Sequence, residues 1–177
     1  MSKATFIKIG HQLCEFFNTD NISEVKILDV GHGHGCGLID LSYEFGITPV
    51  GIEKDTLMYK GSLLHLKLYI EQQPSDHTCI PFIPINGDGL DLSTFGGAEV
   101  AYCWGKGAPV NLMHHMKTIF VNDETCKILI TSKRYDDNTL MIDNLKRGMK
   151  MNGTFHTSSM VLYFYERKKQ TQNYIQQ

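Results

Sequence analysis

The chain has 177 residues, of which 42% are hydrophobic and 20% are charged, and its formal net charge is −2. This composition excludes the disordered and membrane classes of protein. The length predicts a single domain, residues 1–177, with a core large enough to be stable without disulfides or metal ions. The charge gives no general attraction to nucleic acid. Because no segment is long and apolar enough for a membrane span or a signal peptide, we expect an intracellular protein, cytoplasmic or nuclear.

Helical and strand patterns alternate along the chain. Apolar periodicity predicts helices over 5–17, 38–45, 56–70 and 112–120, and strands over 25–30, 48–52, 80–85, 100–104 and 127–131. Gly46 is expected to cap the second helix in a left-handed conformation. Pro81 and Pro84 cannot donate to a strand ladder, so 80–85 is predicted to be an edge strand.

The C-terminal part follows a different pattern. Residues 149–156 and 160–166 alternate with a period of two, which predicts an antiparallel pair. Residues 1–24 are expected to form a helix and a lead-in, and 168–177 a frayed tail. The predicted class is therefore α/β, a Rossmann-like doubly wound sheet of about seven strands, mostly parallel, with a C-terminal antiparallel hairpin.

The first predicted strand runs into a glycine loop, Asp29-Val-Gly31-His-Gly33-His-Gly35. Glycines allow a sharp turn and let backbone N–H groups approach a ligand, which in doubly wound folds lies beyond the carboxyl end of this strand. The dinucleotide fingerprint G-x-G-x-x-G is not met, because Cys36 stands three residues after Gly33. The carboxylate of Asp29 suits a cationic ligand better than a pyrophosphate. A glycine turn without a ligand is the alternative.

Two further acidic residues follow predicted strands. Glu53 ends the second strand, near the spacing of about 20 residues expected for a carboxylate that accepts ribose hydroxyls. Asp88 follows the third strand within Asn86-Gly-Asp-Gly89. The alternatives are a solvated surface charge for Glu53 and a turn residue for Asp88.

Cysteine and histidine spacings argue against a metal site or a disulfide framework. None of the five cysteines is in C-x-x-C spacing, so we expect thiols of a reducing compartment. His32 and His34 have no third ligand at a suitable spacing, and His114 and His115 diverge by about 100° on a helix. We predict no metal ion.

The D-x-G-x-G-x-G pattern resembles the first motif of class I S-adenosylmethionine-dependent methyltransferases. The resemblance implies S-adenosylmethionine as the cofactor, with Asp29 near its amino group, Glu53 near its ribose and Asp88 near its adenine amine. Taken together, the residues that it places around the cofactor are Asp29, Gly31, His32, Gly33, Gly35, Glu53, Lys54, Gly87, Asp88 and Cys103.

Over about residues 25–167 the chain also resembles the catalytic core of the non-SET histone lysine methyltransferases, the disruptor-of-telomeric-silencing family. The similar stretches are Gly51-Ile-Glu-Lys54, Gly87-Asp88, Ile130-Thr-Ser-Lys133 with Tyr135, and Val161-Leu-Tyr-Phe-Tyr165. After the fourth strand, where that family has Asn-Asn-Phe, this chain has Cys103-Trp-Gly105. The resemblance implies methyl transfer to a lysine of a protein substrate, with a histone as the family's own substrate.

A lysine acceptor must lose its proton, and an apolar channel favours the neutral amine. The candidates to line such a channel are Tyr102, Trp104 and Tyr135, which we take as the catalytic residues; core packing is their alternative role. Two other functions stay open at this point. One is methyl transfer to RNA or a small molecule, and the other is a non-catalytic methyltransferase fold that binds a partner.

Overall fold

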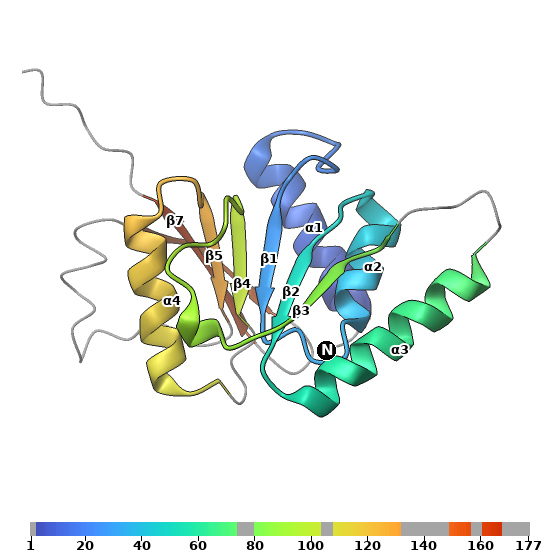
Figure 1. Ribbon diagram of the computed structural model, residues 1–177. Coiled ribbons are helices and arrows are strands. Elements are labelled where there is room, and N and C mark those ends of the chain that lie inside the picture. The colour runs from blue at the N-terminus through green and yellow to red at the C-terminus, as the bar shows by residue number, and fades with distance from the viewer. Residues whose placement is uncertain (1–2, 74–79, 104–107, 132–148, 157–160, 168–177) are drawn as a thin grey trace, which may run out of the picture.

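The structure is a computed structural model that describes residues 3–73, 80–103, 108–131, 149–156 and 161–167, with no side chains described for 149–156, 161 and 167. Helices and strands follow the predicted order (Figure 1). They are α1 (Lys3–Phe17), β1 (Ile27–Val30), α2 (Cys36–Phe45), β2 (Val50–Glu53), α3 (Thr56–Gln72), β3 (Ile83–Asn86), the 3₁₀ helix η1 (Gly89–Asp91), β4 (Val100–Cys103), α4 (Val110–Asn122), β5 (Ile128–Thr131), β6 (Met149–His156) and β7 (Val161–Arg167).

One sheet with the strand order β3-β2-β1-β4-β5-β7-β6 joins all the strands. The first five strands are parallel, and β7 pairs antiparallel with both β5 and β6. The predicted α/β class with its C-terminal antiparallel pair is therefore confirmed. β1 lies in the middle of the sheet, and Asp29 is paired with Gly51 of β2 and Tyr102 of β4. The predicted tail 168–177 lies outside the described residues.

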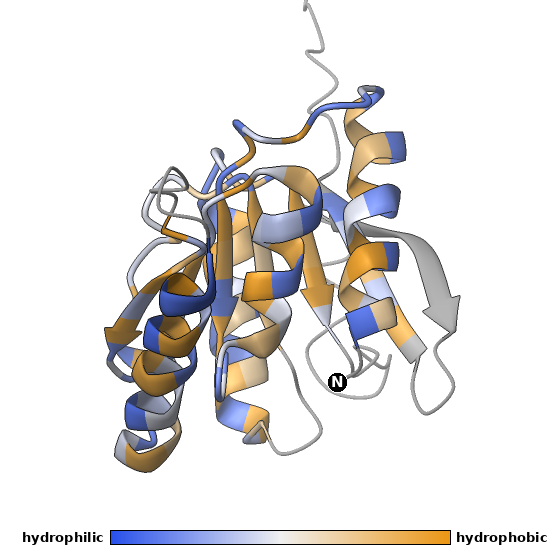
Figure 2. Ribbon diagram, turned by 90° about the vertical axis from the view of Figure 1, so that its right-hand side faces the viewer, coloured by the Kyte–Doolittle hydropathy of each residue, from blue (hydrophilic) through white to orange (hydrophobic). Residues whose placement is uncertain are grey.

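The two faces of the sheet carry separate cores, because successive side chains of a strand point to opposite faces. On one face, the buried side chains of α1 and α2 pack against Ile27, Val100 and Tyr102. On the other face, those of α4 pack against Leu28 and Ala101. The strands are predominantly hydrophobic, whereas the helices also carry hydrophilic residues (Figure 2). No helix in the described part of the chain is long and apolar enough to cross a membrane.

Local sequence explains several boundaries. Asp55 caps α3, because its carboxylate accepts hydrogen bonds from the backbone N–H groups of Leu57 and Met58. Gly46 ends α2 with φ 68°, and its N–H donates to the Ser42 carbonyl, so the predicted cap is confirmed. β3 is the predicted edge strand, but it begins at Ile83 rather than Ile80.

Candidate functional site

The glycine loop turns the chain away from β1 through left-handed conformations. The φ angles are 89° at Gly31, 60° at Gly33 and 72° at Gly35, values that L side chains rarely adopt. A Cβ atom at Gly31 or Gly33 would have no described heavy atom within 4 Å, whereas one at Gly35 would lie 2.4 Å from the Phe82 ring. Gly35 is therefore needed for packing, and the backbone at the other two glycines lies open for a ligand to approach.

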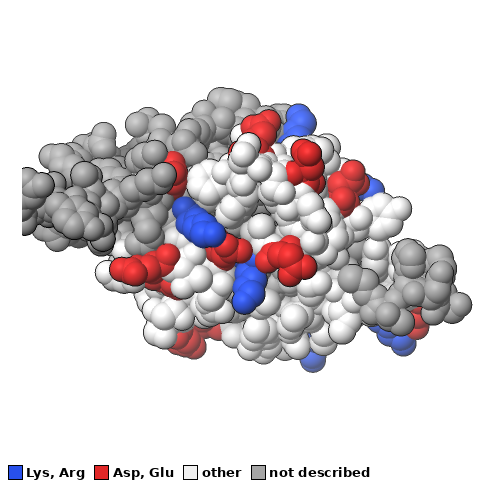
Figure 3. Space-filling model, turned by 90° about the horizontal axis from the view of Figure 1, so that it is seen from above, with Lys and Arg blue, Asp and Glu red and all other residues white. Residues whose placement is uncertain are grey.

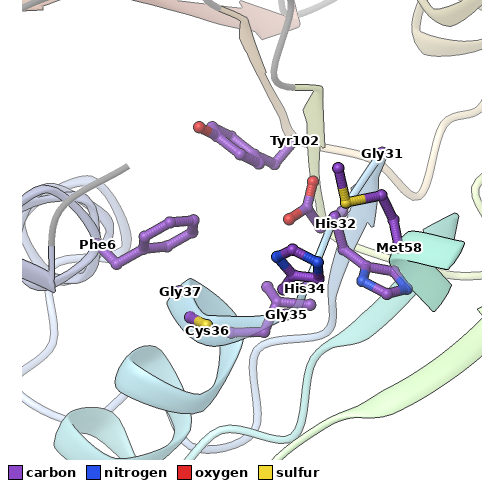
Figure 4. A pocket seen from close by; sticks show the side chains of 12 residues that line it. Phe6, Gly31, His32, His34, Gly35, Cys36, Gly37, Met58 and Tyr102 are labelled. Atoms are coloured by element: carbon purple, nitrogen blue, oxygen red, sulfur yellow. The ribbon is translucent and has the colours of Figure 1, made fainter. Parts of the chain in front are cut away.

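A cavity of about 320 Å³ lies beside this loop, at the carboxyl end of β1. Its volume falls in the range of small-molecule sites. Phe6 and Tyr102 lie on one side, Met58 on another, and the start of α2 below (Figure 4). The lining residues are Phe6, Asp29, Gly31, His32, Gly33, His34, Gly35, Cys36, Gly37, Leu38, Met58 and Tyr102.

Asp29 is the buried carboxylate of this cavity. Its side chain is 3% exposed, and among the described residues none donates a hydrogen bond to its Oδ1 atom. Burial raises the pKa of Asp29 well above its usual range, and the nearby charge of Glu53 raises it further. An unsatisfied buried carboxylate costs folding free energy, so a ligand that supplies a cation or a donor gains an interaction prepared for it.

His32 lies in the same cavity with a similar lack of partners. It is 8% exposed, and neither ring nitrogen has a hydrogen-bond partner in the described part of the chain. Its ring meets the Phe82 ring edge to face at 5.6 Å and fills the space that a side chain at Gly51 would need. Burial lowers the pKa of His32, while the charge of Glu53 partly offsets this effect. Burial thus favours the neutral form of the His32 imidazole, which lies between the loop and β2.

Glu53 fastens the glycine loop to the start of α3. Its Oε2 accepts a hydrogen bond from the Gly33 backbone N–H at 2.9 Å, and its Oε1 accepts one from the Asp55 N–H at 2.8 Å. Sequence reasoning missed this structural role, because it considered a ligand contact and, as the alternative, a solvated surface charge. Each carboxylate oxygen keeps a second lone pair, so Glu53 can fix the loop and still accept a hydroxyl group.

Lys54 and Asp88 form an exposed ion pair next to Glu53, outside the cavity lining. The Lys54 Nζ donates to Asp88 Oδ2 at 2.5 Å, and Asp88 Oδ1 accepts from the Leu90 N–H at 3.0 Å. This pairing raises the pKa of Lys54 and lowers that of Asp88. The Gly87 N–H donates to the Glu53 carbonyl at 3.1 Å. We call Glu53, Lys54, Gly87 and Asp88 the rim; these predicted residues lie together at the carboxyl ends of β2 and β3.

The site residues predicted in and after the fourth and fifth strands do not all lie in the cavity. Tyr102 lines the cavity, is 3% exposed and stacks edge to face with Phe6 at 5.9 Å. Burial raises the pKa of Tyr102 well above its usual range, and Asp29 adds to the effect. The Cys103 side chain is fully buried in the core under α4, on the opposite face of the sheet, so it is not brought into the cavity. Trp104 and Tyr135 lie outside the described residues.

The cavity also contains residues that the sequence analysis did not single out. Phe6 comes from α1 and Met58 from α3, and no motif or spacing marks either of them. Cys36, the first residue of α2, places its Sγ atom 3.1 Å from His65 Nδ1. Within the described ranges, no three His, Cys, Asp or Glu side chains come together as a metal site.

The end of the sheet opposite the cavity has no dominant charge. Acidic and basic side chains are interspersed there when the molecule is seen from above (Figure 3). One such pair is Lys127 and Glu99, with Nζ and Oε1 2.5 Å apart. A surface of mixed sign does not attract polyanions from a distance.

No protein-family model and no curated protein sequence matches the chain. Solved structures of methyltransferases are similar to it in fold. An RNA methyltransferase from Salinibacter ruber in complex with S-adenosyl-L-homocysteine has a TM-score of 0.63 and 14% identity, over 90% of each chain. Magnesium protoporphyrin IX methyltransferase from Synechocystis PCC 6803 with bound S-adenosylmethionine has a TM-score of 0.67 and 15% identity, over 94% of this chain and 79% of that one.

Ribosomal protein L11 methylase from Lactobacillus delbrueckii subsp. bulgaricus has a TM-score of 0.63 and 10% identity, over 96% of this chain and 81% of that one. At these identities the likeness concerns the fold alone. The chain therefore has the α/β Rossmann-like methyltransferase fold.

Proposed function

We propose that the cavity binds S-adenosylmethionine and that the chain transfers its methyl group to an acceptor. The observation that carries this proposal is the buried Oδ1 of Asp29, which lacks a donor among the described residues and lines a cavity beside open glycine backbone. The methionine end of the cofactor has an ammonium group and a sulfonium. Both are cations, and a buried carboxylate interacts more strongly with a cation than an exposed one does.

The rim fits the other end of the same molecule. Glu53 has free lone pairs for the two ribose hydroxyls, and its hydrogen bonds to Gly33 and Asp55 fix it in place before a ligand arrives. Asp88 is held by Lys54 and Leu90 and keeps lone pairs for the adenine amine. β2 and β3 are neighbouring strands, so Glu53 and Asp88 lie one after the other across the sheet. This order matches the order of ribose and adenine in the cofactor.

When bound, the cofactor supplies an electrophilic methyl group. The residues of the chain then contribute mainly by orientation, since an in-line displacement is accelerated by holding the reacting groups in place. Phe6 and Tyr102 form an aromatic wall on the side of the cavity next to α1. Such a wall excludes water and disfavours a charged amine.

We further propose a protein lysine as the acceptor. The support is the resemblance of Gly51-Ile-Glu-Lys54, Gly87-Asp88 and Val161-Leu-Tyr-Phe-Tyr165 to the disruptor-of-telomeric-silencing family, together with the placement of Tyr102 in the cavity wall. Tyr102 provides the aromatic surface that an apolar lysine channel requires. RNA and small molecules are the other acceptor classes to be tested.

Labelled methyl transfer tests both steps. The wild-type chain and Asp29→Asn are incubated with radiolabelled S-adenosylmethionine and, separately, core histones, total RNA and a metabolite extract. We expect label in histone lysine with the wild type alone. Label only in RNA or metabolites would overturn the lysine acceptor but would still support methyltransferase activity. If the wild-type chain bound neither S-adenosylmethionine nor S-adenosylhomocysteine, the proposed function itself would be overturned.

A further inference from the structure

Cys36 and His65 form a thiol–imidazole pair that the proposed methyl transfer does not use. Cys36 is the first residue of α2 and is exposed, and its Sγ atom lies 3.1 Å from Nδ1 of His65 on α3. By contrast, Cys14 is half-buried, and Cys103 and Cys126 are buried. Of the cysteines in the described ranges, Cys36 is therefore the one most accessible to a reagent in solution.

The packing of α3 against the glycine loop fixes the position of His65. Met58, Gly61 and His65 have the spacing of residues on one face of a helix, and this face meets the loop. A Cβ atom at Gly61 would lie 2.5 Å from the His34 ring, so the missing side chain lets this ring pack on the helix. The His34 and His65 rings meet edge to face with their centroids 5.4 Å apart. The imidazole of His65 is therefore held next to Cys36.

The surroundings of the pair favour transfer of the thiol proton to the imidazole. His65 Nδ1 also lies 3.3 Å from the His34 carbonyl oxygen. The Nδ1–H of an imidazolium at His65 can donate toward both the Cys36 sulfur and this carbonyl, whereas a neutral imidazole whose Nδ1 accepts from the thiol offers the carbonyl no donor at that atom. The partial positive charge at a helix N-terminus also stabilises an anion at the first residue. Nucleophile, proton acceptor and orienting group thus have the arrangement of an activated thiol.

The pair lies at a cavity that is prepared for a ligand. Cys36 lines the cavity together with Asp29 and His32 (Figure 4). Both of these polar side chains are more than nine-tenths buried, and in the described part of the chain Asp29 Oδ1 and both His32 ring nitrogens have no hydrogen-bond partner. Because Cys36 belongs to the lining, a group attached to its sulfur takes up space that a ligand of this cavity needs.

We infer that Cys36 is a modification site, whose sulfur forms a mixed disulfide with low-molecular-weight disulfides, and that the attached group closes the cavity to the cofactor. The closure rests on the proposed function. In the exchange, the Cys36 thiolate attacks one sulfur of the small disulfide, and the old S–S bond breaks as the new one forms. The departing thiolate takes the proton from the His65 imidazolium. A disulfide bond is transferred and no further oxidant is needed, and excess thiol reverses the step.

The rate of mixed-disulfide formation tests the site itself. The chain is treated near neutral pH with dithiobis(nitrobenzoate), an aromatic disulfide, and the label on each of the five cysteines is followed by peptide mass spectrometry. We expect Cys36 to react at least about tenfold faster than the half-buried Cys14. Because a cysteine without an adjacent base is only a few per cent thiolate at neutral pH, His65→Gln should slow the Cys36 reaction at least about fivefold.

His114→Gln is the matched control for this variant. His114 is half-buried like His65 but belongs to α4, which packs on the other face of the sheet, so its replacement should leave the Cys36 rate unchanged. The buried Cys103 should stay unlabelled in every variant, which reports that the fold is intact. Equal rates for Cys36 and Cys14 in the wild type, or an unchanged Cys36 rate in His65→Gln, would overturn the modification site. These rates involve no cofactor, so they are independent of methyl transfer.

Titration with S-adenosylhomocysteine tests the closure of the cavity. Modification of the wild type should lower the affinity at least about tenfold, and dithiothreitol should restore it. In Cys36→Ser, the same treatment should leave the affinity as it was in that variant before treatment. If the modified wild type binds as tightly as the unmodified chain, the closure is wrong. If the unmodified chain does not bind, the closure is overturned together with the proposed cofactor site, and the labelling rates still decide the modification site.

Discussion

The cavity and the rim both carry carboxylates of the proposed cofactor site, but under opposite conditions. In the cavity, Asp29 is buried and no described residue donates to its Oδ1. In the rim, both oxygens of Glu53 and both oxygens of Asp88 accept hydrogen bonds from nearby groups. The carboxylate oxygens of the rim therefore have hydrogen-bond donors without a ligand, whereas Asp29 Oδ1 in the cavity has none among the described residues. We therefore expect the affinity for the ligand to depend most on the cavity, and the preorganisation of the site to depend on the rim.

The largest expected effect comes from Asp29→Asn. The amide keeps the shape of the side chain and removes the charge, so affinity for S-adenosylhomocysteine should fall about 10- to 100-fold. The free energy of unfolding should stay the same or increase, since a buried unpaired charge is removed. Calorimetric titration and urea unfolding measure the two quantities. Asp40→Asn on α2 is the control for binding, and equal affinity in Asp29→Asn and the wild type would contradict the distinction between cavity and rim.

The glycine loop separates backbone strain from ligand access. Gly33→Ala and Gly96→Ala both place a side chain at a positive φ, 60° and 61°, with no described heavy atom near the new methyl group. Each should cost about 1–2 kcal/mol of stability. Only Gly33 lines the cavity, so only Gly33→Ala should weaken cofactor binding, by about tenfold. Equal binding by both variants would show that the ligand does not approach the loop backbone.

His32 should make the cavity sensitive to acid. Its pKa in the folded chain is lowered by burial, so the unfolded chain, with a pKa near 6.5, takes up the proton first. Stability is then complete above about pH 6.5 and is lost as the pH falls toward the lower folded pKa. His32→Phe should remove this part of the loss below about pH 6.5 in urea unfolding. Parallel pH curves for the two proteins would contradict the effect.

The smallest effect is expected in the exposed part of the rim. Lys54→Met removes an ion pair in which the lysine side chain is 71% exposed, and such pairs contribute little. Affinity for S-adenosylhomocysteine should change less than about threefold, and the change should shrink further in high salt. A loss as large as that of Asp29→Asn would mean that the cofactor depends on the rim rather than on the cavity.

The sequence predicted the parts of this site that are local in the chain. Asp29 and its glycines lie in one strand–turn–helix unit, so their neighbourhood is fixed by a few residues. Gly46 and the edge position of β3 were likewise predicted from single residues with strong backbone preferences. These features depend on short-range geometry, which a pattern of residue types conveys.

Other features depend on how distant elements meet. Phe6 reaches the cavity because α1 packs on the same sheet face as Tyr102, and Met58 because α3 lies across the loop. Neither contact has a sequence signal. The face to which Cys103 points follows from the register of β4 against β1, which pairs it with Val30 on the α4 side. The role of Glu53 in fastening the loop needed coordinates, since it depends on a backbone N–H twenty residues away.

Titration of the wild-type chain with S-adenosylhomocysteine at a series of pH values tests the central claim most directly. The ligand carries the same ammonium and ribose groups and undergoes no transfer. We predict one site per chain, with an affinity that rises with pH as the raised pKa of Asp29 is passed and the carboxylate ionises, and a flat profile in Asp29→Asn. Absence of binding, or the same pH profile in both proteins, would contradict the assignment of Asp29 and its cavity to the cofactor.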